Sequence, residues 1–557
     1  MNNDPKNRFQ EIFLDSWRPF FWIALIIFLV YSATLSFNIV YLDDNLLATD
    51  SYFYNKDLSN LPGAFIEDIF RTPNQSGSYY RPLLRATFML DAQFGEGLVI
   101  FMSHLDNLLL HIFAVCLLFI LLIKFGIKKE TALWLSVIFG VHPLTAQTVS
   151  FIPGRNDSLL AIFVFPALWF FRDLLETGKM RSYFWHLFFL ALALLTKETA
   201  VIVPALCFIY AIIFEGGLTG QGKKIIANLT NYLYLLIGWL SLYSGWFLIR
   251  KAILNNVVGN ADYHIVSSIF QNFPSLAPAI GKIFLPFNLS VFPVLRDMTM
   301  AYGIISLALL LAWFIFSHNK NYRLLIFGAV WFGLFILPTL IKPMDVLPNF
   351  NENRIYLPML GFIFIFLGMG RVKFAEFIDK RIITILGLLL IIIFSSVTIF
   401  RNKYFENGIN FWQNAVATSP SHAFNYNNLG AVYYLEGKYD LAEKEFRKAL
   451  EINTQEKLAH NNLGLIYAGR GDFENAIKEY EAELKINPVY GNALYNTGLA
   501  YWNMGKKDDA IEKWKETIRT NLDYFDAYKV LITIYQENGQ KDLANRLLSE
   551  LQRRGGL

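Results

Sequence analysis

Ten long apolar runs occupy most of the first 400 residues and constrain the fold of this chain more than any other feature. A helix needs about 20 apolar residues to cross the roughly 30 Å hydrocarbon core of a bilayer. Because hydrocarbon offers the backbone no hydrogen bonds, such runs fold as helices that satisfy their own amides. The runs lie near residues 19–40, 101–123, 130–149, 156–171, 183–215, 231–249, 302–317, 323–341, 355–370 and 381–400.

One run is too long for a single helix, and another segment is too irregular. The run 183–215 is interrupted by the polar residues 196–198, so we expect two helices that meet at a polar turn. Residues 273–292 contain three prolines and Lys282, which fits an interfacial or re-entrant piece better than a span. The sequence therefore predicts eleven transmembrane helices.

Basic residues in the loops predict how these helices are oriented, because Lys and Arg of short loops concentrate on the cytoplasmic side. With the N-terminus in the cytoplasm, eleven spans place every basic loop cluster on that side. The clusters lie at residues 124–129, 172–181, 223–224, 318–323 and 371–381. The loops 41–100 and 342–355 and the C-terminal portion then face the opposite side, which would be the periplasm in a bacterium. The first run is a full span without a small-residue cleavage site, so we expect it to remain as the first membrane helix.

The C-terminal portion differs in composition and carries a 34-residue repeat. Residues 401–557 hold 41 Asp, Glu, Lys and Arg, whereas residues 1–400 hold 53. The repeated columns are Gly430, Gly464 and Gly498; Tyr433, Tyr467, Tyr501 and Tyr535; Gly437, Gly471, Gly505 and Gly539; and Ala442, Ala476, Ala510 and Ala544. This period is typical of tetratricopeptide repeats (TPRs), each a pair of helices.

The sequence thus predicts an all-α chain with two domains. We place a polytopic membrane domain at residues 1–401 and a TPR solenoid at residues 402–557, with a half repeat at 402–420 and full repeats to about 553. Stacked TPRs form a concave groove that commonly holds a peptide. Five asparagines recur on one helix of each pair and are candidates for lining it by bonding a peptide backbone: Asn427, Asn428, Asn461, Asn462 and Asn496. They are equally compatible with ordinary packing between helices.

Two features exclude other classes of function. Cys116 and Cys207 both lie within apolar runs, so neither a disulfide framework nor a cysteine metal site is expected. The net charge of +4 is small for a chain of this size and gives no footprint for nucleic acid.

Polar residues concentrate on the predicted non-cytoplasmic side of the membrane domain. Asp43 and Asp44 follow the first span, and two carboxylates there fit a general base, a metal ligand or a hydrated loop. The other members of this set are Tyr80 and Arg81, His104 and His111, His142, Arg155 and Asp157, Lys197 and Glu198, and Arg354. Together they predict a polar cavity for a substrate that has a hydroxyl to activate and a phosphate to neutralise.

These motifs, in this order and ahead of a TPR array, resemble the transmembrane and tetratricopeptide-repeat protein O-mannosyltransferases and their bacterial relatives. The motifs are Asp43-Asp44, the Tyr-Arg-Pro-Leu at 80–83, the His-Pro at 142–143, the Gly-Arg-Asn-Asp-Ser-Leu at 154–159, Lys197-Glu198 and the Arg-Ile-Tyr-Leu-Pro at 354–358. The chain departs from the pattern where an acidic residue is expected just before Arg354, because Asn353 stands there and Glu352 lies one position further back.

The resemblance implies a GT-C-type glycosyltransferase. Such an enzyme transfers a sugar, here mannose, from a polyprenyl-phosphate donor to Ser or Thr hydroxyls of proteins with inversion. No cofactor is required, and the aspartate pair leaves room for a divalent metal without demanding one.

Chemistry then assigns roles to the polar set. Asp43 is the first choice as the general base and Asp44 its assistant, because a hydroxyl needs a proton acceptor while the sugar bond forms. Fixed cations stabilise the departing phosphate best in a low-dielectric pocket, and Arg81, Arg155, Lys197 and Arg354 are the candidates. Tyr80, His142, Asp157 and Glu198 complete the expected substrate-binding set.

Two alternatives remain open from the sequence. A ligase or polymerase of lipid-linked polysaccharide would also be a membrane enzyme, but that class relies on a large late loop with Arg and His. Here the longest loop is the first, with eight acidic and four basic residues between Tyr41 and Ile100. The other alternative is a non-catalytic membrane scaffold or transporter that recruits partners through its TPRs. Eleven spans are more than an anchor needs, and the sequence shows no pair of corresponding broken helices of the kind that marks the inverted repeats of transporters.

Overall fold

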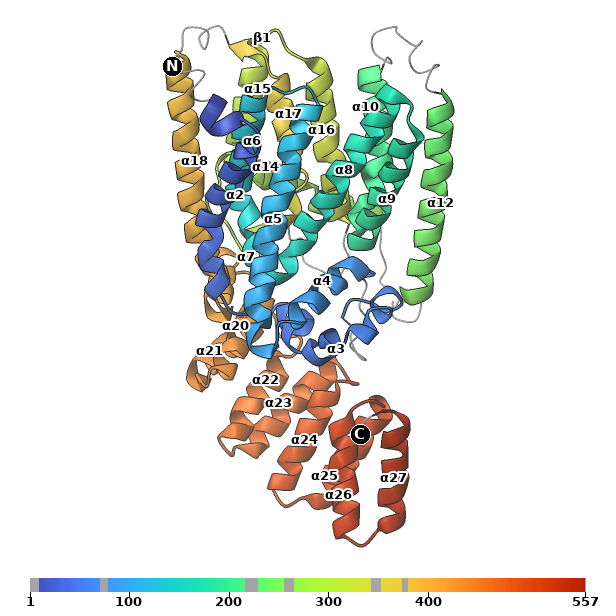
Figure 1. Cartoon of the computed structure of the whole chain (residues 1–557). Coiled ribbons are helices and arrows are strands. Elements are labelled where there is room, and N and C mark those ends of the chain that lie inside the picture. Colours follow the sequence, from blue (N-terminus) through green and yellow to red (C-terminus); the bar gives the residue numbers. More distant parts are fainter. Residues whose placement is uncertain are drawn as a thin grey trace. The chain divides into compact units, whose positions relative to one another are not determined.

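The computed structural model describes residues 10–70, 79–215, 229–254, 265–341, 352–372 and 379–555. The chain forms two compact units, Met1–Asn414 and Ala415–Leu557. The described residues are almost entirely helical, which confirms the all-α fold class (Figure 1). The domain boundary at residue 402 stays a prediction, and the division between the compact units falls inside helix α19 (Gly408–Thr418).

Long apolar helices make up the first unit, and their length follows from the need to cross hydrocarbon. Helix α5 (Val99–Lys124) has 26 residues, about 39 Å at 1.5 Å per residue. The other apolar helices of the bundle are α2 (Arg18–Tyr31), α6 (Lys129–Gly140), α8 (Arg155–Thr177), α9 (Met180–Thr196), α10 (Val203–Glu215), α12 (Leu229–Leu254), α15 (Ala301–Phe316), α16 (Tyr322–Ile336), α17 (Met359–Gly368) and α18 (Lys380–Asn402).

Seven helical stretches among the described residues are long and apolar enough to span a membrane, and a bent pair, Lys129–Gly140 with Pro143–Ser150, raises this to eight. The chain is therefore an integral membrane protein. The predicted count of eleven stays a prediction, because α9 and α15 are shorter apolar helices and α17 has only ten residues. The basic pair 223–224 and residues 342–351 of a predicted outer loop lie outside the described residues.

The predicted break in the run 183–215 is confirmed, whereas the interfacial or re-entrant placement of residues 273–292 stays a prediction. Helix α9 ends at Thr196 and a 3₁₀ turn, η9 (Glu198–Ile202), precedes α10, so the run 183–215 does break at its polar residues. In the proline-rich segment, α14 (Leu276–Phe284) has nine residues, about 14 Å, which is too short to cross a bilayer.

Helices α16 and α17 approach each other more closely than any side chain would permit. A Cβ atom added to Gly328 would lie 2.4 Å from the Gly361 carbonyl oxygen, and one added to Gly361 would lie 2.5 Å from the Gly328 oxygen. Small residues at such a crossing let backbones pack directly, which is the usual basis of helix association in membranes. The crossing fixes α17, whose N-terminal approach carries Arg354.

The first loop folds as a small domain at one end of the helical bundle. It contains η3 (Asn45–Thr49), α3 (Tyr52–Lys56), η4 (Leu58–Asn60), η5 (Gly63–Phe65) and α4 (Pro82–Ala92). Its core includes Leu47, Leu84 and Phe88, which pack with Ile152 from the turn before α8. In Figure 1, α3 and α4 lie at the end of the bundle opposite to strand β1. That strand (Ser317–His318) pairs antiparallel with β2 (Arg371–Val372), so two predicted cytoplasmic loops meet there.

The second unit is a row of helix pairs, which confirms the TPR prediction. The pairs are α20 (Ala423–Leu435) with α21 (Tyr439–Ile452), α22 (Ala459–Gly469) with α23 (Phe473–Ile486), α24 (Gly491–Asn503) with α25 (Lys507–Thr520), and α26 (Phe525–Glu537) with α27 (Lys541–Arg553). The repeated glycines have two physical roles. Gly437 has a φ of 71° in the turn between the two helices of its pair, and its three equivalents also have a positive φ. Gly464 makes room for Tyr480, since a Cβ atom there would lie 2.4 Å from the ring.

Candidate active site

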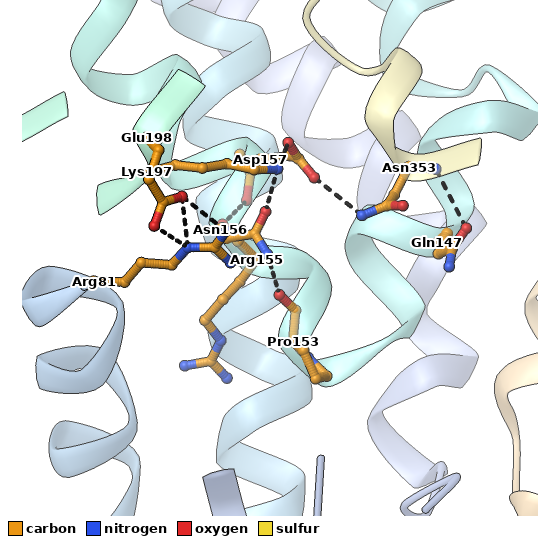
Figure 2. A network of polar contacts seen from close by, with 10 residues as sticks. Arg81, Gln147, Pro153, Arg155, Asn156, Asp157, Lys197, Glu198 and Asn353 are labelled. Carbon is orange, nitrogen blue, oxygen red and sulfur yellow. Dashed lines mark hydrogen bonds and ion pairs between the residues drawn. The ribbon is translucent and has the colours of Figure 1, made fainter. Parts of the chain in front are cut away.

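Polar side chains from four separate segments meet at the first-loop end of the membrane unit, as Figure 2 shows. The segments are the approach to α4, the N-terminus of α8, the turn between α9 and η9, and η13 (Glu352–Ile355). The sequence-predicted residues Arg81, Asp157, Lys197 and Glu198 are bonded to one another in pairs within this cluster.

The guanidinium of Arg81 forms a two-point ion pair with Glu198. Its Nη2 lies 2.9 Å and its Nε 3.1 Å from Oε2, and its guanidinium carbon lies 4.3 Å from the centre of the Tyr79 ring. Burial by itself lowers the pKa of Arg81, but the Glu198 carboxylate outweighs this effect, so the net pKa is raised. Arg81 is therefore a fixed positive charge.

The ammonium of Lys197 pairs with Asp157 and not with Glu198, its neighbour in sequence. Its Nζ lies 2.5 Å from Asp157 Oδ1 and 2.8 Å from Asn156 Oδ1. The second Asp157 oxygen accepts a hydrogen bond of 3.2 Å from the side-chain Nδ2 of Asn353. The backbone N–H of Asn353 donates to Gln147 Oε1 at 3.3 Å. Burial lowers the pKa of Lys197, Asp157 opposes that effect, and the Arg81 charge adds to it.

Arg354 brings a positive charge to the cluster without a matching carboxylate. Its Nη1 donates to the Thr339 carbonyl oxygen at 3.2 Å, and within the described residues no carboxylate lies in ion-pair range of its guanidinium. Burial lowers the pKa of Arg354, and the nearby Arg81 charge lowers it further, while Tyr79 and Asp157 oppose the shift. Since the Arg81 and Lys197 pairs are neutral, these three cations and two carboxylates carry one net positive charge.

The two adjacent aspartates have different surroundings. Asp44 is 1% exposed, and its carboxylate accepts hydrogen bonds from the backbone N–H groups of Val40, Leu42 and Asn45 at 2.5, 2.9 and 3.0 Å. Burial raises its pKa to about 7 despite these bonds. Asp44 thus builds the turn at the start of the loop.

Asp43 has different surroundings from Asp44. It is exposed, and its φ of 67° is in the left-handed region, as is that of Tyr41 at 61°. Such a backbone is uncommon outside glycine and persists where neighbouring bonds enforce it, often at functional sites. Loss of surrounding water raises the pKa of Asp43, and the Arg81 charge opposes that rise. The Asp43 carboxylate is therefore within electrostatic range of the cation cluster.

Arg155 lies beneath this cluster and is engaged by the protein. It is 0% exposed, and its Nη1 lies 2.8 Å from Asp91 Oδ2. Its other bonds reach Asn107 Oδ1 at 2.7 Å, the Ser103 oxygen at 2.7 Å and Thr87 Oγ1 at 3.2 Å, and it stacks on Phe88. Four of the five N–H donors of Arg155 are engaged by these partners and the side chain is buried, so it fastens the α8 N-terminus to α4 and α5.

His142 and Tyr80 are also placed as structural residues. The Nδ1 of His142 accepts from the Leu144 N–H at 3.1 Å, so its Nε2 carries the proton that is donated to the Ile283 oxygen at 2.9 Å. The Tyr80 hydroxyl donates to the Phe65 oxygen at 3.0 Å, which ties the loop together. Both side chains are buried, and their predicted contact with substrate stays a prediction.

Sequence reasoning missed a buried ion network beside the cluster. Glu352 lies between Lys282 and Arg401, and its Oε2 is 2.6 Å from Arg401 Nη2. All three side chains are buried. The sequence shows an unusual charge at both positions, since Lys282 lies in an apolar, proline-rich segment and Glu352 lies ahead of Arg354. Nothing in the sequence indicates that these two residues, 70 positions apart, form a pair.

The predicted groove asparagines bond to one another across neighbouring repeats. Asn462 Nδ2 donates to Asn427 Oδ1 at 3.0 Å, and Asn496 Nδ2 donates to Asn461 Oδ1 at 3.1 Å. Asn428 Nδ2 donates to the Phe424 oxygen of its own helix at 2.8 Å. Asn427, Asn461, Asn462 and Asn496 thus form a ladder between neighbouring repeats, Asn428 stands outside it, and the role of all five toward a peptide stays a prediction.

Comparison with family models places known families on both units. Residues 96–246 match the dolichyl-phosphate-mannose-protein mannosyltransferase family. Residues 423–454, 458–488 and 492–520 each match a tetratricopeptide repeat. A crystal structure of MamA is 24% identical with a TM-score of 0.25, covering 27% of this chain and 87% of that one.

Curated relatives are named as protein O-mannosyl-transferases. Protein O-mannosyl-transferase TMTC3 of Homo sapiens is 24% identical over 453 residues, which are 72% of this chain and 48% of that protein. Tmtc2 of Drosophila melanogaster is 28% identical over 35% of this chain and 22% of that protein. The chain spans about half the length of the first of these relatives. It joins a mannosyltransferase-type segment to TPRs and is a relative of the TMTC protein O-mannosyltransferases, as its motifs indicated.

Proposed function

We propose that the membrane unit transfers a sugar, mannose by analogy with its relatives, from a polyprenyl-phosphate donor to Ser or Thr hydroxyls of protein acceptors. The charge balance of the cluster carries the proposal. Arg81 and Lys197 are each neutralised by a carboxylate, whereas Arg354 has no carboxylate partner among the residues that the structure describes. An unmatched, partly buried cation is costly, and a phosphate would offset it.

The reaction assigns complementary tasks to the two sides of the site. The acceptor oxygen bonds to C1 of the sugar while the bond from C1 to the phosphate oxygen breaks, and the electron pair leaves with the phosphate. Asp43 takes the hydroxyl proton, because the residue is exposed, whereas the Asp44 carboxylate is engaged by the turn. Arg354, assisted by Arg81 and Lys197, stabilises the negative charge that grows on the phosphate. With base and leaving group on opposite faces of the sugar, the product is inverted.

No cofactor is part of this proposal. The fixed cations supply the charge that a metal ion would otherwise bring. Among the described residues no three His, Cys, Asp or Glu side chains gather as a metal site would require. Whether Asp43 and its neighbours also bind a divalent ion is decided by assaying turnover with and without a chelator.

The proposed site and the TPR unit act on the non-cytoplasmic side of the membrane. The arrangement of loops supports this, because β1 and β2 join two basic loops at one end of the bundle and the first loop lies at the other. We assign the TPR unit the task of holding the protein acceptor in an extended form, which is the common use of such arrays.

A transfer assay in sealed vesicles tests the proposal directly. The purified chain is reconstituted and offered radiolabelled polyprenyl-phosphate sugars together with a Ser/Thr peptide on one side at a time. We expect label in the peptide with one donor and from the non-cytoplasmic side only. Labelled lipid-linked polymer instead of peptide would identify a ligase or polymerase, and no transfer with any donor would favour a scaffold.

Replacing the unmatched cation tests the observation on which the proposal rests. Arg354→Gln should lower kcat/KM about 100- to 1000-fold, because one charged donor to the leaving phosphate is lost. Arg354→Lys keeps the charge but not the planar fork, so it should retain part of the activity. Equal turnover by wild type and Arg354→Gln would remove Arg354 from the site.

A further inference from the structure

The chain that leaves the last membrane helix is bonded to both sides of the proposed site. We call residues 401–414 the exit segment; it comprises the end of α18, η15 (Lys403–Phe405) and the first half of α19. All contacts described here lie within the membrane unit. Asn402 anchors the segment, since its Oδ1 accepts from Ser150 Oγ at 2.9 Å and its Nδ2 donates to the Val30 oxygen at 3.1 Å.

On one side, the exit segment holds residues 38–40, which lead to Asp43. The Asn38 N–H donates to the Glu406 oxygen at 2.9 Å. The indole Nε1 of Trp412 donates to the Val40 oxygen at 3.0 Å, and Trp412 is fully buried against Phe411 and Phe292. Because Asp44 already accepts from the Val40 N–H, both backbone polar groups of Val40 are held.

On the other side, the exit segment holds the turn that carries Arg354. Arg401 Nη2 lies 2.6 Å from Glu352 Oε2, and Arg401 Nη1 donates to the Pro143 oxygen at 2.8 Å. Glu352 also pairs with Lys282 and accepts from the Ser290 N–H at 3.0 Å. These contacts engage both carboxylate oxygens of Glu352, which is two residues from Arg354.

We propose that the exit segment sets the spacing between the Asp43 carboxylate and the Arg354 guanidinium, with Trp412 and Arg401 as its positioning residues. This inference rests on the proposed function, because the spacing matters only if base and leaving-group cation act on one substrate. The physical reason is that transfer requires both groups to be placed within a fraction of an ångström, and a displacement of about 1 Å costs about 100-fold in rate. Neither group lies on a long helix, so each needs an external support.

Trp412→Phe removes the indole N–H and keeps an aromatic ring in the same place. We expect kcat to fall 10- to 100-fold, the KM for the donor to stay unchanged, and amides 38–44 to exchange hydrogen faster. Trp313→Phe is the matched control, because the Trp313 indole donates to the Gly370 oxygen at 3.2 Å beside β2, far along the bundle. The control should lose the same kind of bond and leave kcat unchanged.

Arg401→Lys tests the contact between the exit segment and the Arg354 turn. Here we expect the effect in the KM for the donor rather than in kcat. The shorter cation keeps its charge opposite Glu352 but cannot also reach Pro143, so the Arg354 turn loosens. We expect the KM for the donor to rise several-fold while the acid limb of the pH profile stays in place.

The outcomes separate this inference from the proposed function. If Trp412→Phe has the kcat and the exchange rates of Trp313→Phe while Asp43→Asn is inactive, the exit segment does not position the base and only this inference falls. The same holds if Trp412→Phe and Arg401→Lys lose activity only in proportion to their fall in Tm. If Asp43→Asn turns over normally, the proposed function falls instead, and hydrogen exchange of amides 38–44 still decides whether Trp412 holds the loop.

Discussion

Asp43 and Asp44 are neighbours in sequence, yet their environments give them different tasks. The Asp44 carboxylate accepts hydrogen bonds from three backbone N–H groups of its own turn, whereas Asp43 is an exposed residue near the Arg81 charge. Burial raises the pKa of Asp44 to about 7 although the backbone N–H groups oppose the rise. The exposed Asp43 is therefore the member suited to accept a proton from a bound hydroxyl.

Asp43→Asn should lower kcat by about 100- to 10,000-fold, the usual contribution of a general base. The Asp43 side chain has no bond in the turn, so the variant should keep the Tm of the wild type. Asp44→Asn is the contrasting variant, because an amide nitrogen cannot accept from the turn N–H groups and the loop should lose stability. Wild-type turnover by Asp43→Asn would rule it out as the base.

The pH profile follows from the direction of the Asp43 shift. A base works only when it is ionised, so kcat rises as pH rises through its pKa. Since desolvation raises that pKa, the acid limb of the profile should lie above the ordinary Asp value of about 3.9. The limb should vanish in Asp43→Asn, leaving a low, flat rate.

Sequence located most polar residues of the site but not their pairing. Lys197 and Glu198 suggest a local ion pair, whereas Lys197 bonds Asp157 and Glu198 bonds Arg81. Partner choice depends on which segments meet in space, and a single sequence does not carry that information. Arg155 shows the same limit, because its engagement by Asp91 and Asn107 depends on how α4 and α5 pack.

At the scale of elements, helix positions were predictable where hydrophobicity and breaks are strong. The turn at 196–198 stands out because charged residues interrupt an apolar run. The extent of α17 was overestimated, since residues 355–358 are apolar or aromatic but do not continue the α-helix. An apolar run records burial, and burial alone does not distinguish a helix from the irregular chain that precedes it.

Gly328→Val tests the close crossing of α16 and α17. The added Cβ would meet the Gly361 oxygen at 2.4 Å, so the helices must separate, at a cost of about 1–3 kcal/mol. We expect a lower Tm in detergent and lower transfer activity, because α17 leads away from the Arg354 turn. Gly333→Val on the same helix has nothing within 4 Å of the added Cβ and is the matched control. Equal Tm values for the two variants would contradict the packing argument.

At the scale of the whole molecule, the chain joins a membrane unit that has the proposed site to a repeat unit that has none of its residues. Both units were predictable as classes, because apolar runs and a 34-residue period are global signals that survive local irregularity. The point of division was less predictable, since Trp412 lies 34 positions before Phe446, as a repeat residue would, but its indole donates to the Val40 oxygen of the membrane unit.

Removing residues 421–557 should separate the tasks of the two units. We expect the shortened chain to bind the lipid donor with unchanged Kd, measured with radiolabelled donor in vesicles, because the Arg354 cluster is intact. Transfer to a protein acceptor should fall at least 10-fold, whereas a short peptide at high concentration should still be modified. Unchanged transfer to the protein acceptor would show that the repeats do not hold it.

The asparagine ladder limits how the repeat unit can change in length. Each rung joins residues that are 35 positions apart, Asn427 with Asn462 and Asn461 with Asn496. An insertion of one whole repeat leaves these rungs closed, whereas an insertion within a helix that carries these asparagines shifts the side chains and opens a rung. Natural variants of the helical parts of this array should therefore differ by whole repeats of 34 residues, and the reach of the array over a bound chain should grow in equal steps.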